Sequence, residues 1–152
     1  MKYLYLVAIL ALCFISCQNK NSDSLPENKK QELKKYLSDN NVYNSQGNQI
    51  YVLLHPDFCG SCTLKIQEFV IKEFSNCDDM DKTLVLSSDK EEVSQRFTNI
   101  KNLNLLTDEE NELQRYDLAN GLELFLVEKD GVHIKSGFIN LSQIEAGMTI
   151  CP

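Results

Sequence analysis

The feature that most constrains the fold is a pair of short apolar runs separated by one amphipathic segment. Gln49–Leu54 and Thr83–Ser87 have the length and composition of strands buried on both faces. Between them, apolar residues recur at helical spacing from Cys59 to about Phe74. One face of this helix carries Cys62, Ile66, Phe69 and Val70. Because a strand, a crossover helix and a second strand pair in parallel, we expect a parallel βαβ unit.

The remaining elements extend this unit in both directions. Further strands are predicted at Leu103–Leu106, Leu122–Val127 and Val132–Ile139. Further helices are predicted at Lys29–Ser38, Ser88–Phe97, Thr107–Leu118 and Leu141–Ala146. The turn Glu128-Lys129-Asp130-Gly131 contains Asp-Gly, which is the strongest hairpin signal in the chain. The pattern therefore predicts one α/β domain whose mixed central sheet is parallel in its N-terminal part and ends in an antiparallel hairpin.

Two of these helix starts are assigned from capping boxes. Ser88 with Glu91, and Thr107 with Glu110, have the spacing at which a hydroxyl and a carboxylate cap a helix reciprocally. The acidic run Asp108-Glu109-Glu110 is interpreted as a solvated first turn at the positive end of the second helix dipole.

The charge balance excludes several classes of partner. The 152 residues contain 22 Asp and Glu against 15 Lys and Arg, which gives a formal net charge of −7. Binding to phosphate needs a basic face, so nucleic acid is not expected as the main partner. The same balance argues against binding to an anionic membrane through surface charge.

The N-terminus is typical of an exported lipoprotein. Lys2 precedes an apolar run over residues 3–15, which is too short to span a bilayer and has the anatomy of a secretory signal. The run ends in Ser16-Cys17, which resembles the bacterial lipobox, and a polar segment follows. We expect a signal peptide at 1–16, lipidation of Cys17, a tether at 17–28 and a domain at 29–152 in the bacterial cell envelope. The alternative is an ordinary signal peptide in which Cys17 is incidental.

The chemistry is predicted at Cys59-Gly60-Ser61-Cys62, where the first buried strand meets the amphipathic helix. Unpaired N–H groups and the dipole at a helix N-terminus stabilise a thiolate, which lowers the pKa of the first cysteine. That thiolate attacks a disulfide, and the second cysteine resolves the mixed disulfide. The reaction needs no cofactor beyond the dithiol itself.

At these residues the chain resembles the thioredoxin superfamily, in particular its envelope-anchored thiol–disulfide oxidoreductases. The resemblance rests on residues 51–62 and 124–131. It implies a thioredoxin-like fold with helices on both faces of the sheet, Cys59 as nucleophile and Cys62 as resolving thiol. The expected neighbours of the active site are His55, Asp57, Phe58, Gly121 and Leu122.

Two positions depart from the family pattern. The family carries a cis-proline just before the first hairpin strand, where this chain has Gly121-Leu122-Glu123, so we expect a trans bond between Gly121 and Leu122. Many members also bury an acid six residues before the first cysteine, where this chain has Leu53.

Metal binding is the main rival use of the cysteine pair. A copper or zinc site needs further ligands, and His55 and His133 are the two histidines of the chain. We interpret His55 as an exposed turn residue and His133 as structural or solvent-facing, and therefore predict no metal site. Asp57 is interpreted as a helix cap, although it could instead raise the pKa of Cys59 by like-charge repulsion.

Three functions remain open at this stage. The leading one is a membrane-anchored thiol–disulfide oxidoreductase that acts on the thiols and disulfides of envelope proteins and exchanges electrons with a redox partner protein. The second is a non-catalytic binding module in which Cys59 and Cys62 form a fixed disulfide. The third is a Cu(I)-delivery protein that uses Cys59, Cys62 and a histidine.

The resemblance also gives a role to two further cysteines. In a thioredoxin-like fold, the helix that begins at Cys59 and the final helix both run away from the active-site end, on the same face of the sheet. Cys77 and Cys151 would therefore meet at the far end, and we predict a structural disulfide between them. The alternative is two unrelated thiols.

Overall fold

The computed structural model describes residues 24–55, 60–88, 91–121 and 123–152. A five-stranded sheet has the order β3-β2-β1-β4-β5. Its strands are β1 (Gln49–Leu54), β2 (Asp81–Leu86), β3 (Leu103–Thr107), β4 (Leu124–Lys129) and β5 (Val132–Phe138). The pairs β1–β2 and β2–β3 are parallel, whereas β1–β4 and β4–β5 are antiparallel.

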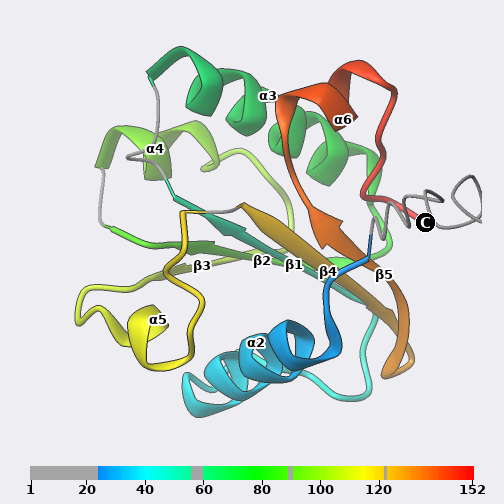
Figure 1. The fold of residues 1–152 in the computed structure, drawn as a ribbon. Helices are drawn as coiled ribbons and strands as arrows, with labels where there is room; N and C mark the ends of the chain where they lie inside the picture. The colour runs from blue at the N-terminus through cyan, green and yellow to red at the C-terminus, as the bar shows by residue number, and fades with distance from the viewer. Residues whose placement is uncertain (1–23, 56–59, 89–90, 122) are drawn as a thin grey trace, which may run out of the picture.

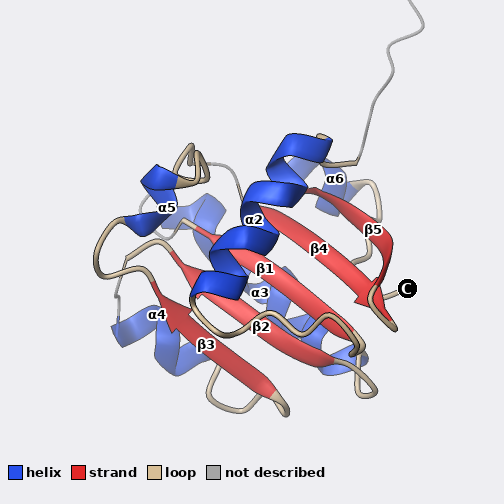
Figure 2. Cartoon of the chain, turned by 90° about the horizontal axis from the view of Figure 1, so that it is seen from below, coloured by secondary structure: helices blue, strands red, loops and turns tan. Residues whose placement is uncertain are grey.

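Helices cover both faces of this sheet (Figure 1). One face carries α3 (Gly60–Asn76), α4 (Glu91–Arg96) and α6 (Leu141–Glu145). The other face, seen in Figure 2, carries α2 (Glu27–Asp39) and α5 (Glu112–Arg115). This arrangement confirms the predicted thioredoxin-like α/β fold, with a parallel first half and an antiparallel hairpin at one edge.

The central strand β1 shows why helices must cover both faces of the sheet. All six of its residues are buried. Ile50, Val52 and Leu54 belong to the core beneath α3, whereas Tyr51 and Leu53 belong to the core beneath α2. Because successive side chains of a strand point to opposite faces, this one apolar run supplies two cores. In the sequence, the absence of alternating polar residues in this run indicates that the strand is buried on both faces.

The folded part begins earlier than the predicted domain boundary. Helix α2 begins at Glu27, after Pro26, instead of at Lys29. Leu25, which we had assigned to the tether, is only 2 % exposed and packs in the core beneath α2 with Leu33 and Leu37. A proline at the N-terminus of a helix lacks only an N–H that would have no helical partner, which is why the helix starts there.

The predicted helix Thr107–Leu118 is wrong in both extent and cap. Helix α5 spans four residues. Its N-terminal amides are capped by Asp108, whose carboxylate oxygens accept from the N–H of Glu112 (2.8 Å) and of Leu113 (3.0 Å). Asp108 is buried, so the acidic run is not the solvated first turn that we expected. A carboxylate that bonds to two amides can be buried at little cost.

The predicted hairpin turn is present and docks against the loop that precedes β1. Asp130 and Gly131 have φ angles of +51° and +74°, as a two-residue hairpin connection between twisted strands requires. A Cβ atom at Gly131 would also collide with the carbonyl oxygen of Ser45. Glycine is therefore needed there both for its backbone conformation and for the close approach.

Candidate active site

Helix α3 is the element that follows β1 in the chain, and it carries Cys62 in its first turn. Cys62 is half-buried. Helix α3 is 17 residues long, and its first turn contains no acidic residue. The positive end of its dipole is thus not offset by a carboxylate within that turn, and such an end favours a thiolate over a thiol. Cys59, Asp57 and Phe58 lie outside the described residues, so the geometry of the cysteine pair stays a prediction.

His55 occupies a different environment from the one we predicted. It follows the last residue of β1 and is 4 % exposed. The prediction that His55 is an exposed turn residue is therefore wrong. The cause is its position at the centre of the sheet, where β1 has β2 on one side and β4 on the other. His55 is therefore a buried residue at the carboxyl end of β1.

Sequence analysis missed one acidic residue at this edge. Glu123 immediately precedes β4, which runs antiparallel to β1. Glu123 therefore lies at the carboxyl end of β1, the end of the sheet from which the chain leads to α3. Alternation with Phe125, which packs in the core beneath α3, assigns Glu123 to the same face. The Glu123 residue is half-buried, its carbonyl accepts from the N–H of Ile139 (2.8 Å), and burial raises the pKa of its carboxyl group. A charged residue just before an apolar strand is the available sequence signal.

The two departures from the family pattern have different outcomes. Leu53 is fully buried in the core beneath α2, where apolar packing replaces the acid found in many members. Gly121 has a φ angle of +66°. Leu122 lies outside the described residues, so the trans bond between Gly121 and Leu122 stays a prediction.

The two histidines lie at opposite ends of the sheet. His133 pairs in register with Glu128, which in turn pairs with Gln49 at the beginning of β1. It is exposed, as we expected, and its ring Nε2 lies 2.9 Å from the hydroxyl of Ser136. Partial desolvation of the ring, together with the positive charges of Lys30 and Lys34, lowers the pKa of His133. Of the two histidines, His55 is therefore the one adjacent to the cysteine motif.

Metal-binding groups are scarce in the part of the chain that the structure describes. Within residues 24–55, 60–88, 91–121 and 123–152, no group of three or more His, Cys, Asp or Glu side chains is placed to hold a metal ion. None of the helices there is long and apolar enough to cross a membrane.

The predicted partner of Cys77 is found at the other end of α3. Cys77 follows the last turn of the helix and forms a disulfide with Cys151, with a Cα–Cα distance of 5.8 Å. This distance lies in the ordinary range for a disulfide. The bond joins the C-terminal residues to α3 across 74 positions of sequence.

The strand order, the antiparallel hairpin and the helix that begins after the central strand define a thioredoxin-like α/β protein. Two solved structures resemble it. One is a secreted disulfide oxidoreductase of Mycobacterium tuberculosis, homologous to DsbE of E. coli, with 17 % identity over 67 % of this chain and 79 % of that chain, at a TM-score of 0.44. The other is StoA from Bacillus subtilis, with 15 % identity over 69 % and 84 % of the two chains, at a TM-score of 0.39. No protein-family model and no curated protein matches the chain.

Proposed function

We propose that this protein is a thiol–disulfide oxidoreductase that uses Cys59 and Cys62 as its redox pair. The observation that carries the proposal is the position of Cys62, half-buried in the first turn of α3 at the carboxyl edge of the central strand. Ligands of open α/β sheets bind at this edge. Cys59 lies three residues earlier in the sequence, and we expect the dipole and the unpaired amides at this end of α3 to favour its thiolate.

The reaction needs two exchanges. The thiolate of Cys59 attacks one sulfur of a client disulfide, forms a mixed disulfide and releases the first client thiolate, which takes up a proton. Cys62 then loses its proton, attacks the sulfur of Cys59 and releases the second client thiolate, which takes up the proton that Cys62 has lost. The client disulfide gains two electrons and two protons, and the pair becomes the Cys59–Cys62 disulfide. The reverse sequence oxidises a client dithiol.

We propose Glu123 as the acid that exchanges protons in these steps. It lies at the same edge and on the same face of the sheet as the start of α3, and burial raises the pKa of its carboxyl group. A carboxyl with a raised pKa exchanges protons more readily near neutral pH. In this proposal Glu123 takes the proton of Cys62, a function that Leu53 has no group to perform.

The cellular setting follows from the N-terminal segment. We propose that residues 1–16 are removed, that Cys17 carries the lipid, and that the domain acts on envelope proteins outside the cytoplasm. Support comes from the sequence 1–17, which lies outside the described residues.

A trapping experiment tests the redox function. The Cys62→Ser variant of the full chain removes the resolving thiol, so mixed disulfides between Cys59 and its clients should accumulate in envelope extracts. The Cys59→Ser/Cys62→Ser variant is the matched control and should trap none of them. Equal capture by both variants would contradict the proposal.

Two observations support the alternatives. Leu53 supplies no acid at the position where many members of the family bury one, which favours a fixed Cys59–Cys62 disulfide in a binding module. His55 lies four residues before Cys59 in the sequence, so it is the histidine that a Cu(I)-delivery site at the motif would use as a third ligand. Retention of one Cu(I) per chain at sub-micromolar concentration, lost in His55→Ala, would favour copper delivery over disulfide exchange.

A further inference from the structure

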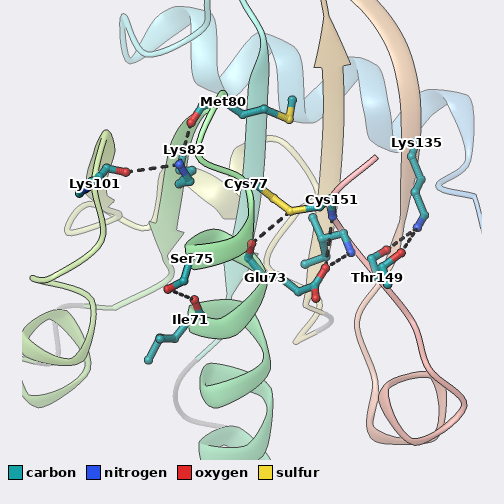
Figure 3. The surroundings of a disulfide bond; sticks show 11 residues. Ile71, Glu73, Ser75, Cys77, Met80, Lys82, Lys101, Lys135, Thr149 and Cys151 are labelled. Carbon is teal, nitrogen blue, oxygen red and sulfur yellow. Dashed lines mark hydrogen bonds between the residues drawn. A yellow bond between two sulfur atoms is a disulfide. The ribbon is translucent and has the colours of Figure 1, made fainter.

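The last residues of the chain cross the C-terminal end of α3. We call residues 146–152 the C-terminal strap. Ile150 is fully buried in the core beneath α3, and Cys151 forms the disulfide with Cys77. Cys77 is 6 % exposed. Figure 3 shows the strap held between α3 on one side and Lys135 of β5 on the other.

Glu73 makes the contacts on the α3 side. Its carboxylate Oε2 accepts from the N–H of Ile150 (2.5 Å) and of Cys151 (3.2 Å), and the residue is only 6 % exposed. Its main-chain carbonyl oxygen lies 3.1 Å from the sulfur of Cys151. On the other side, Lys135 Nζ donates to the carbonyl oxygen of Thr149. Figure 3 shows Glu73 pointing at the strap next to the disulfide and Lys135 pointing at Thr149.

We propose that Glu73 and the C-terminal end of α3 protect the Cys77–Cys151 disulfide from reduction. Cleavage of this bond must release a thiolate at one of the two sulfurs. A thiolate on Cys77 would form at the negative end of the helix dipole. A thiolate on Cys151 would form beside the carbonyl oxygen and the buried carboxylate of Glu73. Neither leaving group is stabilised, so exchange is slow and the disulfide is favoured at equilibrium.

The two ends of α3 therefore favour opposite redox states. The N-terminal end stabilises a thiolate in the Cys59–Cys62 motif, and the C-terminal end destabilises one at Cys77. A reductant strong enough to reduce the motif would leave the strap attached. The protection of Cys77–Cys151 does not depend on whether Cys59 and Cys62 are a catalytic pair, so the two proposals can fail separately.

The test measures reduction of this one bond by dithiothreitol in the folded full chain. Two electrons and two protons pass from the reagent, which forms its cyclic disulfide, to the two protein sulfurs, which become thiols. Differential alkylation followed by peptide mass spectrometry counts the thiols at Cys77 and Cys151 separately from those at Cys59 and Cys62. Circular dichroism before reduction verifies that each variant is folded.

Glu73→Gln keeps the shape and the hydrogen-bond acceptor but removes the charge. In this variant we expect dithiothreitol to reduce the Cys77–Cys151 disulfide about tenfold faster. The exchange equilibrium should shift tenfold toward the two thiols, which is equivalent to about 30 mV. Two variants serve as controls. Lys135→Met removes the contact on the opposite side of the C-terminal strap, and Glu68→Gln removes an exposed charge from α3, the helix that carries Glu73. Both controls should match the parent chain. Protection in Glu73→Gln equal to that of the parent, or equal acceleration by Lys135→Met, would overturn the proposal.

A second comparison separates charge from packing. Glu73→Asp shortens the side chain but keeps the carboxylate, whereas Glu73→Gln keeps the length. If charge protects the bond, the Asp variant is reduced more slowly than the Gln variant. If packing alone protects it, the order is reversed and the proposal fails. The pair Glu73→Asp and Glu73→Asn gives the same contrast at the shorter length, should Glu73→Gln not fold.

Discussion

Replacement of Lys34 by Met should destabilise the fold through the carboxylate that it leaves behind. Glu128 is the fifth residue of β4, and its side chain is 0 % exposed. Lys34 Nζ of α2 lies 2.5 Å from Oε1 of this carboxylate, and the Lys34 side chain is 26 % exposed. Burial, together with the nearby Glu128 carboxylate, raises the pKa of Tyr43.

The magnitude follows from the burial of Glu128. Breaking a buried ion pair by removing one partner costs about 3–5 kcal/mol, because the remaining charge is neither solvated nor paired. Because the Lys34 side chain is 26 % exposed, the pair is only partly desolvated, and we expect a loss at the lower end of this range, about 3 kcal/mol in the free energy of unfolding. Lys34→Met combined with Glu128→Gln should recover most of the loss, because no charge is then buried.

Urea unfolding followed by circular dichroism measures these differences. Lys35→Met, at the exposed neighbouring position of α2, is the matched control and should change the free energy by less than about 0.5 kcal/mol. Burial alone would lower the pKa of Lys34, but its hydrogen bond to Glu128 outweighs this and raises it. The stabilisation should therefore be constant at neutral pH and disappear as the pH rises past the ordinary lysine value of 10.5. A loss below about 1 kcal/mol in Lys34→Met, or no recovery in the double variant, would refute the reasoning.

Three further predictions concern single residues. Asp108→Ala should cost about 1–2 kcal/mol in urea unfolding because it removes the cap of α5, whereas Glu109→Ala, at an exposed position, should cost less than about 0.5 kcal/mol. Equal costs would contradict the assigned cap. Gly131→Ala should cost about 1–3 kcal/mol because φ is +74° and the added Cβ meets Ser45, and a neutral effect would mean that the turn relaxes freely. Burial raises the pKa of Glu123, so ionisation of its carboxyl group above the ordinary pKa of 4.5 opposes folding. Glu123→Gln should therefore raise the melting temperature at neutral pH and leave it unchanged at acidic pH. The reverse pattern would contradict the burial of this carboxyl group.

Sequence periodicity predicted those parts of the fold that depend on local pattern. The run Gln49–Leu54 is apolar throughout because β1 is buried on both faces, and its predicted bounds agree with the structure. The Asp130-Gly131 turn was predictable because its positive φ angles select those residue types. The Cys77–Cys151 disulfide followed from topology once the resemblance to the thioredoxin superfamily was given.

The errors arose where tertiary burial decides the outcome. Asp108 reads as a solvated acid, but its position after β3 buries it against the amides of α5. The sequence around His55 predicts a turn, yet His55 is buried because it directly follows the central strand. Glu123 precedes an apolar strand, but nothing in the local sequence indicates that its carboxyl group is half-buried. Leu25 reads as tether because one apolar residue carries no periodicity.

The most direct test of the redox function is the equilibrium of the Cys59–Cys62 pair in glutathione buffers of graded ratio. Alkylation and mass spectrometry of the full chain give the fraction of the pair that is oxidised at each ratio, while Cys77 and Cys151 serve as the internal reference. We predict a reversible transition of the Cys59–Cys62 pair at a potential above about −300 mV. A pair that stays oxidised below that potential, or that never forms a disulfide, would contradict a role in thiol–disulfide exchange.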